Sequence, residues 1–270
     1  MDEPSEVQRH LYVGYLGVPR RHALFLAVAV PLALGAMVIG AMGLATSGQE
    51  WQEPWGNGFW ATETVEVTGV YSASPYPMVH EPTPDGSVSS HLLVQIGKFG
   101  VASSFDTDDR VWLDGADVVV TGVPIERDGR RMLEVDLSRP IEEVIRPAEV
   151  PVDVAPEATE LKGVESMTLS GEIVDAKCYM GAMKPGRGRG HKACATLCVQ
   201  GGIPPIVYSV SPEGDARYHL LVDQEGRGLT GERLDEVLPF IGDPITVTGA
   251  ESRVGSWRVL RIVSGKITPL

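Results

Sequence analysis

The stretch PITVTGAE, residues 244–251, repeats an earlier stretch, DVVVTGV, residues 117–123, and this repeat predicts the fold. Both stretches contain four consecutive β-branched residues, a composition typical of strands. Similar short segments recur along the chain, and the 31 glycines and 20 prolines supply turns between them. The sequence therefore predicts a mainly β protein.

A second shared motif, HLLV, lies upstream of each VTG sequence. From His91 to Gly122 is 31 residues, and from His219 to Gly249 is 30. In both halves a glycine precedes the VTG glycine by seven residues and a leucine follows it by 11: Gly115 and Leu133 in the first, Gly242 and Leu260 in the second. Self-similarity of this kind indicates two copies of one β module.

The number and length of the predicted strands favour a small OB-like β-barrel for each module. We assign residues 61–145 to the first module and residues 165–270 to the second. The stretch between them, 146–164, is rich in proline and glutamate and is expected to be a linker. His80 lies between two predicted strands of the first module, in a segment expected to be a loop.

The two copies differ at one place, between their first and second strands. From Gly69 to His91 is 22 residues, whereas from Gly171 to His219 is 48, so the second copy is longer by 48 − 22 = 26 residues. All three cysteines of the chain lie in this insertion, which we place at 175–205. Loops on a rigid scaffold commonly carry function, so the insertion is the predicted functional segment.

The insertion contains the candidate site residues. Its segment 191–200 holds helix formers and is followed by two glycines, which predicts a short helix with His191, Cys194 and Cys198 on one face. Cys178 can fold back across a glycine-rich loop. Three cysteines and one histidine complete a tetrahedral zinc site. We therefore predict that Cys178, His191, Cys194 and Cys198 bind a metal or cofactor, with zinc, copper or an iron cofactor as candidates.

Neighbouring side chains extend this prediction. Met180 and Met183 follow Cys178, and thioether, thiolate and imidazole donors together suit Cu(I). The insertion is also the basic stretch of an acidic chain, and its cations either solvate an exposed loop or hold an anion. These candidate anion-binding residues are Lys177, Lys184, Arg187, Arg189 and Lys192.

Two alternatives to a metal site stay open from the sequence. A disulfide from Cys178 to Cys194 or Cys198 would pin the inserted loop, contribute about 3 kcal/mol, and leave one thiol free. A thiol-redox or metal-dependent enzyme would use a cysteine as nucleophile and His191 as its base. Because the sequence contains no established catalytic motif, we assign no catalytic residue.

An uncharged apolar stretch near the N-terminus predicts a transmembrane helix over 23–46. It is longer than the apolar region of a cleaved signal peptide. Arg20 and Arg21 precede it, so the positive-inside rule places a tail, 1–22, in the cytoplasm. After a linker, 47–60, the β modules would lie in the periplasm or another extracytoplasmic space, held at the inner membrane by a single span.

The charge of the chain excludes one class of partner. It has 23 lysines and arginines against 36 aspartates and glutamates, a net charge of −13. Nucleic-acid binding requires a basic footprint, so we expect no nucleic-acid partner.

Two resemblances add to these predictions. The pattern D-x-x-C, H-x-x-C-A-x-x-x-C and G-G-x-P-P within residues 175–205 is similar to a segment of uncharacterised single-span bacterial envelope proteins, and no function comes with it. The order of short tail, span and outward OB-like barrel resembles the haem chaperones of cytochrome maturation. The H-x-x-x-Y motif through which those proteins carry haem is absent here, so this resemblance implies architecture and not haem binding.

The combined features predict a membrane-anchored accessory subunit or assembly factor of a membrane redox complex, active in electron transport. Its partner would be an integral membrane protein complex, and its insertion would bind a metal or cofactor. The alternatives are the cysteine-dependent enzyme and a purely structural subunit with a disulfide-pinned docking loop.

Overall fold

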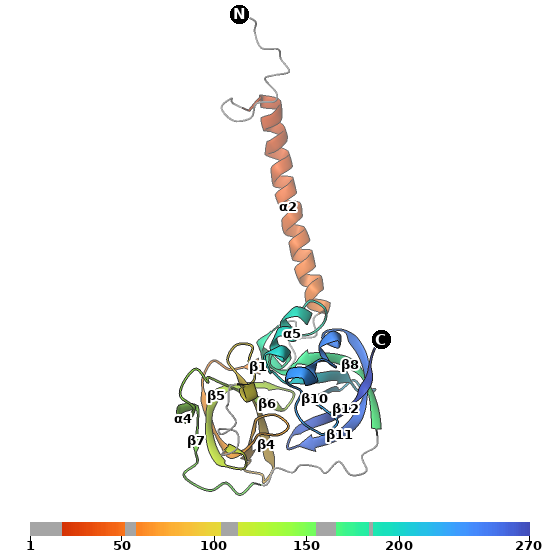
Figure 1. Cartoon of the computed structure of the whole chain (residues 1–270). Helices are drawn as coiled ribbons and strands as arrows, with labels where there is room; N and C mark the ends of the chain where they lie inside the picture. Colours follow the sequence, from red (N-terminus) through yellow and green to blue (C-terminus); the bar gives the residue numbers. More distant parts are fainter. Residues whose placement is uncertain (1–17, 52–57, 104–112, 155–165, 184–185) are drawn as a thin grey trace, which may run out of the picture. The chain divides into compact units, whose positions relative to one another are not determined.

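The computed structural model of the 270-residue chain describes residues 18–51, 58–103, 113–154, 166–183 and 186–270. These residues belong to two compact units, Met1–Pro54 and Trp55–Leu270. The first contains an apolar helix, and the second contains two closed five-stranded β-barrels (Figure 1). The predicted mainly β class is confirmed.

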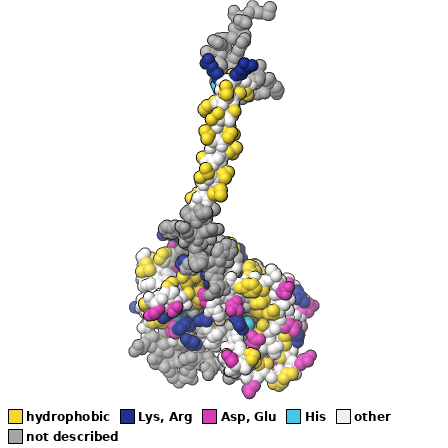
Figure 2. Space-filling view, turned by 180° about the vertical axis from the view of Figure 1, so that it is seen from behind, with side chains coloured by type: hydrophobic (Ala, Val, Ile, Leu, Met, Phe, Trp, Pro, Cys, Tyr) yellow, Lys and Arg dark blue, Asp and Glu magenta, His cyan; other side chains and the backbone are white. Residues whose placement is uncertain are grey.

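Helix α2 runs from Arg20 to Trp51. Its segment Arg20–Leu44, of 25 residues, is long and apolar enough to cross a membrane. Figure 2 shows hydrophobic side chains along this helix and basic side chains at one of its ends. The helix exceeds the predicted 23–46, and part of the predicted linker 47–60 is helical, because no proline interrupts the chain between Pro31 and Pro54.

The first barrel closes through five strands. They are β2 (Val65–Ser72), β3 (Met78–Pro82), β4 (Val88–Gln95), β5 (Asp117–Arg127) and β6 (Arg130–Val135). Strands β2, β3 and β4 form an antiparallel meander, β4 pairs parallel with β6, and β5 closes the ring against β6 and β2. Strand β3 lies in the segment that was predicted to be a loop, so the loop prediction is wrong for these residues. The glutamate and proline of β3 are unfavourable in strands, and for this reason the sequence did not predict a strand here.

Short elements flank the first barrel. Strand β1 (Phe59–Trp60) pairs with β5 and occupies the end of the predicted linker 47–60. A helical turn, α4 (Ile141–Val144), leads into β7 (Ile145–Pro147), which also pairs with β5. The chain therefore stays on the barrel into the first residues of the predicted linker 146–164.

The second barrel repeats the same strand order. Its strands are β8 (Ser166–Asp175), β9 (Pro205–Val210), β10 (Ala216–Val222), β11 (Pro244–Val254) and β12 (Trp257–Pro269). The parallel pair has the same register in both barrels: His91 lies opposite Arg131, and His219 lies opposite Arg258. The sequence repeat therefore corresponds to a structural repeat.

The shared VTG glycine has a steric explanation. A Cβ on Gly122 would lie 2.7 Å from the carbonyl oxygen of Glu134, and one on Gly249 would lie 2.3 Å from that of Arg261. In each barrel the glycine lets the fourth strand approach the fifth closely. The repeat in the sequence thus marks the same point of closure in both barrels.

The two barrels share a hydrophobic core in addition to the cores inside each of them. Trp257, fully buried, donates its indole N–H to the Ser90 carbonyl at 3.0 Å. In the opposite sense, the Tyr218 hydroxyl donates to the Asp128 carboxylate. Ser90 and Tyr218 precede the equivalent histidines, and their partners lie at the equivalent hairpins, so the modules pack with approximate two-fold symmetry.

The insertion also packs against the first barrel. The N–H of Gly100, in the loop after β4, donates to the carbonyl of Gly201 at 2.9 Å. A Cβ on Gly201 would lie 1.8 Å from the Lys98 carbonyl oxygen, and one on Gly100 would lie 1.9 Å from that of Gly202. Only glycine permits backbones to meet this closely.

We expect Gly201→Ala to destabilise the two-barrel unit by about 1–3 kcal/mol, because the added methyl forces the two backbones apart. Thermal unfolding of the full chain in detergent measures this effect. Gly190→Ala is the matched control, since a Cβ there meets no atom within 4 Å. Equal melting temperatures for the two variants would contradict the close contact.

His80 gives the interface a pH dependence. It lies in β3, fully buried, with Ser72 and Ser90 hydroxyls 2.9 and 2.8 Å from its ring nitrogens. Burial disfavours the imidazolium and lowers the pKa of His80 to about 4. The folded pKa lies below the unfolded value near 6.5, so the stability that the neutral ring provides is lost as pH falls from about 6.5 towards 4.

We therefore expect the melting temperature of the native chain to fall more steeply between pH 6.5 and 4.5 than that of His80→Gln. Glutamine keeps hydrogen-bonding groups at this position and does not titrate. Differential scanning calorimetry across this range makes the comparison. Parallel curves for the two proteins would show that His80 is not responsible.

Candidate metal centre

The end of strand β8 positions the first cysteine. The chain leaves β8 at Asp175 and forms a single π-helical turn, η2 (Cys178–Ala182), closed by the bond from Met183 N–H to the Cys178 carbonyl at 3.0 Å. The Asp175 carboxylate accepts the Cys178 N–H at 2.7 Å. Isolated π-turns occur frequently at functional sites, and this one turns the Cys178 side chain into the shared core of the barrels.

Helix α5 (Lys192–Gln200) supplies the other two cysteines and confirms the predicted helix. It ends in a Schellman motif: Gly202 has φ 99°, its N–H bonds to Val199, and the Ile203 N–H bonds to the Cys198 carbonyl at 3.0 Å. Ala195 and Val199 pack into the core of the second barrel. Cys194 and Cys198 therefore face the core shared with the first barrel.

The structure brings all three sulfur atoms together. The Sγ atoms of Cys178, Cys194 and Cys198 lie within 4.8 Å of one another, and those of Cys178 and Cys198 are 3.9 Å apart. Cys178 and Cys198 are buried, whereas Cys194 is partly exposed. All three are free thiols. The structure therefore gives no support to a disulfide from Cys178 to Cys194 or Cys198, the alternative that the sequence left open.

His191 lies beside this cluster but is not grouped with all three cysteines. It occupies the N-cap of α5, and its Nε2 is 3.1 Å from the Asp175 carboxylate. Both side chains are buried, and together with Cys178 they form a second close group. The predicted four-ligand set is thus divided into two groups that share Cys178, because the buried carboxylate holds the imidazole.

Lys98 reaches the thiols from the first barrel. Its Nζ lies 2.9 Å from Cys194 Sγ and 3.9 Å from Cys198 Sγ. The loop that carries it is fixed by the buried Lys177, whose Nζ donates to the carbonyls of Gln95 and Gly97 at 2.8 and 2.9 Å. The Lys177 ammonium also forms an ion pair with the Glu134 carboxylate. Lys177 of the insertion therefore positions Lys98 of the first barrel at the thiols.

The thiols polarise one another. A hydrogen bond from the Cys178 thiol lowers the pKa of Cys198 to about 7, and the Lys98 ammonium acts in the same direction. The same contact with Cys198, together with burial and the Asp175 charge, raises the pKa of Cys178. The contact therefore favours the thiolate form at Cys198 and the protonated form at Cys178.

The two methionines predicted as soft ligands lie in different surroundings. Met180 is buried in the shared core, and Met183 is exposed. Lys184, a predicted anion-binding residue, lies outside the described residues.

The other predicted anion-binding residues of the insertion have partners of their own. The Asp243 carboxylate pairs with Lys192 at 2.5 Å and with Arg189 at 3.5 Å. The Arg187 guanidinium lies 5.2 Å from the centre of the Tyr208 ring. With Lys177 engaged by Glu134, the described cations point to separate partners rather than to one anion.

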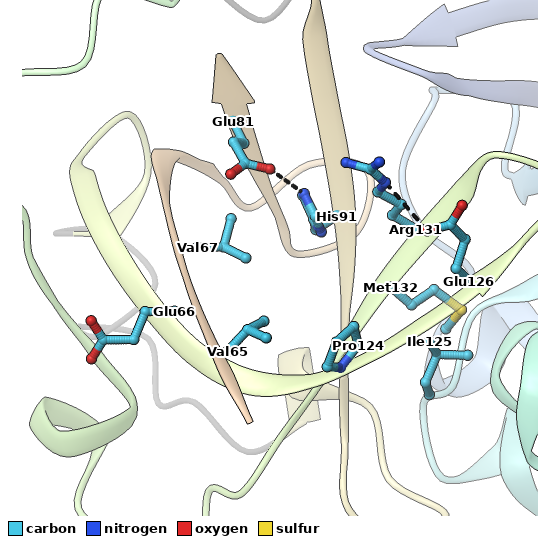
Figure 3. Close-up of a pocket in the computed structure, with 10 residues that line it drawn as sticks. All are labelled: Val65, Glu66, Val67, Glu81, His91, Pro124, Ile125, Glu126, Arg131 and Met132. Carbon is cyan, nitrogen blue, oxygen red and sulfur yellow. Dashed lines mark hydrogen bonds and ion pairs between the residues drawn. The ribbon is translucent and has the colours of Figure 1, made fainter. Parts of the chain in front are cut away.

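A pocket of about 280 Å³ lies on the first barrel, and none of its lining residues is a cysteine (Figure 3). Its wall includes the buried His91, whose Nε2 is 2.9 Å from Glu81. In the second barrel the equivalent His219 lies 2.7 Å from Glu251. The two glutamates come from non-equivalent strands, β3 and β11, and neither pair includes a residue of the insertion.

Two residues of the site were missed from the sequence. Asp175 stands in the D-x-x-C pattern, so its spacing from Cys178 was available as a signal. Lys98 belongs to the module without cysteines, 96 residues before Cys194. Only the packing of the two barrels brings it to the thiols.

Comparisons with protein-family models, with curated proteins and with solved structures found no match to this chain. The functional argument therefore depends on the geometry of the site.

The burial of the thiols predicts an order of reactivity. Cys194 is expected to react first with an aromatic disulfide reagent, and Cys178 and Cys198 only after local unfolding. Cys194→Ser should remove the fast phase. Asp175→Ala should expose Cys178 to the reagent and destabilise the protein by about 3 kcal/mol, because it leaves buried donors unpaired.

Stopped-flow absorbance and thermal unfolding make these measurements. Asp153→Ala, at an exposed position, is the control and should leave both unchanged. A fast phase that persists in Cys194→Ser would contradict the assigned burial.

Proposed function

We propose that this protein is a membrane-anchored metal-binding protein whose site consists of Cys178, Cys194 and Cys198. The observation that carries the proposal is the convergence of three sulfur atoms, from two elements of the insertion, to within 4.8 Å. Thiolates are the preferred ligands of soft ions such as Zn²⁺ and Cu⁺.

The surroundings of the thiols support a bound cation. Ligand thiols must lose their protons on metal binding, and the hydrogen bonding that lowers the pKa of Cys198 favours this loss. Asp175 accepts the backbone N–H of the proposed ligand Cys178 at 2.7 Å, an outer-shell contact of the kind common at metal sites. Burial of two of the three thiols limits their access to solvent oxidants.

The wider role that we propose follows from the anchor and the barrels. Helix α2 spans the inner membrane, with the basic residues at its start in the cytoplasm and the barrels in the extracytoplasmic space. The barrels are of the OB type, supported by five strands in a Greek-key order with one parallel pair. The protein serves as an accessory subunit or assembly factor of a membrane redox complex that contains a metal.

A second candidate function is thiol–disulfide exchange. The observation that favours it is the Cys178–Cys198 pair, 3.9 Å apart, with a pKa of about 7 at Cys198. The two thiols would reduce an incoming disulfide through a mixed disulfide: a Cys178–Cys198 bond would form, the incoming S–S bond would break, and the two protons would pass to the two thiols released from it. Mass spectrometry after exposure to oxidised glutathione tests this: a stoichiometric Cys178–Cys198 bond formed within seconds would favour the exchange function.

Metal titration of the reduced full chain in detergent, under anaerobic conditions, tests the metal proposal. We expect one Zn²⁺ or Cu⁺ per chain, and at least a 100-fold loss of affinity in Cys198→Ser, because two sulfurs remain in place of three.

Met183→Leu is the control, since this exposed thioether should not matter. Binding that persists in Cys198→Ser, or the absence of stoichiometric binding to the native chain, would overturn the proposal.

A further inference from the structure

We infer that the thiol site is selective for a monovalent soft ion, Cu⁺, over Zn²⁺, and that Lys98 of the first barrel contributes to this selectivity as the charge partner of the metal–thiolate complex. The inference rests on the proposed metal site and adds the class of ion and a role for the module without cysteines.

The number of ligands is the first argument. Among the described residues, the mutually close ligand atoms of the cluster are the sulfurs of Cys178, Cys194 and Cys198. A structural Zn²⁺ site takes four protein ligands. His191 is not part of this cluster, because its ring is grouped with Asp175 and Cys178 and not with Cys194 and Cys198. Three sulfurs alone suffice for Cu⁺, a soft ion that accepts trigonal coordination.

The position of a cation is the second argument. The Lys98 ammonium lies 2.9 Å from Cys194 Sγ and 3.9 Å from Cys198 Sγ. Ammonium has no lone pair and does not coordinate a metal. It acts on the site through its charge, so its effect depends on the net charge that the metal leaves on the three thiolates.

The sign of this effect favours the monovalent ion. Three thiolates around Cu⁺ have a net charge of −2, whereas three thiolates around Zn²⁺ have a net charge of −1. A neighbouring positive charge stabilises the first complex more than the second. Because Lys98 is exposed, solvent screens the interaction, and we expect its contribution to the Cu⁺/Zn²⁺ affinity ratio to be about tenfold.

Two contacts hold the loop that carries the Lys98 ammonium in place. The loop after β4 is bound by Lys177 through the carbonyls of Gln95 and Gly97, and by the backbone bond from Gly100 to Gly201. Both anchors belong to the insertion that carries the cysteines. The loop that carries Lys98 belongs to the first module, and the insertion of the second module holds this loop beside the thiols.

Competition titrations of the reduced full chain test the inference. Bicinchoninate serves as the Cu⁺ competitor and 4-(2-pyridylazo)resorcinol as the Zn²⁺ competitor. The native chain should prefer Cu⁺, and Lys98→Leu, which removes the charge without adding a ligand atom, should reduce the affinity ratio about tenfold. Lys98→Arg should retain the ratio, and the difference between Leu and Arg should shrink at 1 M salt, where charges are screened within about 3 Å.

Lys266→Leu, which removes an exposed lysine of β12, is the control for net charge. Thermal unfolding shows that each variant is folded. A preference for Zn²⁺, an equal loss of both affinities in Lys98→Leu, or an effect that salt does not alter would overturn the inference and leave the metal site standing. Failure of the native chain to bind either ion would overturn both.

Discussion

The backbone contact between the loop after β4 and the Gly201-Gly202 end of α5 is the constraint on which the site depends. Gly100 donates to Gly201 at 2.9 Å, and a side chain at either of these two glycines would force the two backbones apart. These glycines directly follow the cysteine helix, and the loop that contacts them carries Lys98 to the thiols. The contact that stabilises the interface between the barrels therefore also determines which residues meet at the site.

Duplication explains how such a site can arise. The two modules share strand order, register and the glycine at which each barrel closes, and they pack with approximate two-fold symmetry. At the junction of the first two strands, residues 73–77 connect β2 to β3, whereas residues 176–204 connect β8 to β9. The longer connection adds three thiols beside an interface that the modules already form. The first module contributes a cation rather than a ligand.

Sequence patterns predicted the parts of the structure that depend on local order. Alternation of β-branched residues located most strands, the repeat located both modules, and two glycines located the end of α5. Strand β3 was missed because its pairing with β2 and β4 outweighs an unfavourable proline and glutamate. His191 was placed with the thiols from helical periodicity, yet the buried Asp175 holds it. Lys98 depends on contact between modules, which no local pattern contains.

X-ray absorption at the edge of the bound metal, on the full chain in detergent, tests the central claim most directly, because it counts the ligand atoms. The account predicts a first shell of three sulfur atoms for the native chain, without an imidazole contribution from His191. A shell of nitrogen and oxygen atoms, or a spectrum that does not change in Cys198→Ser, would contradict the assignment of the inter-barrel thiols as the metal site.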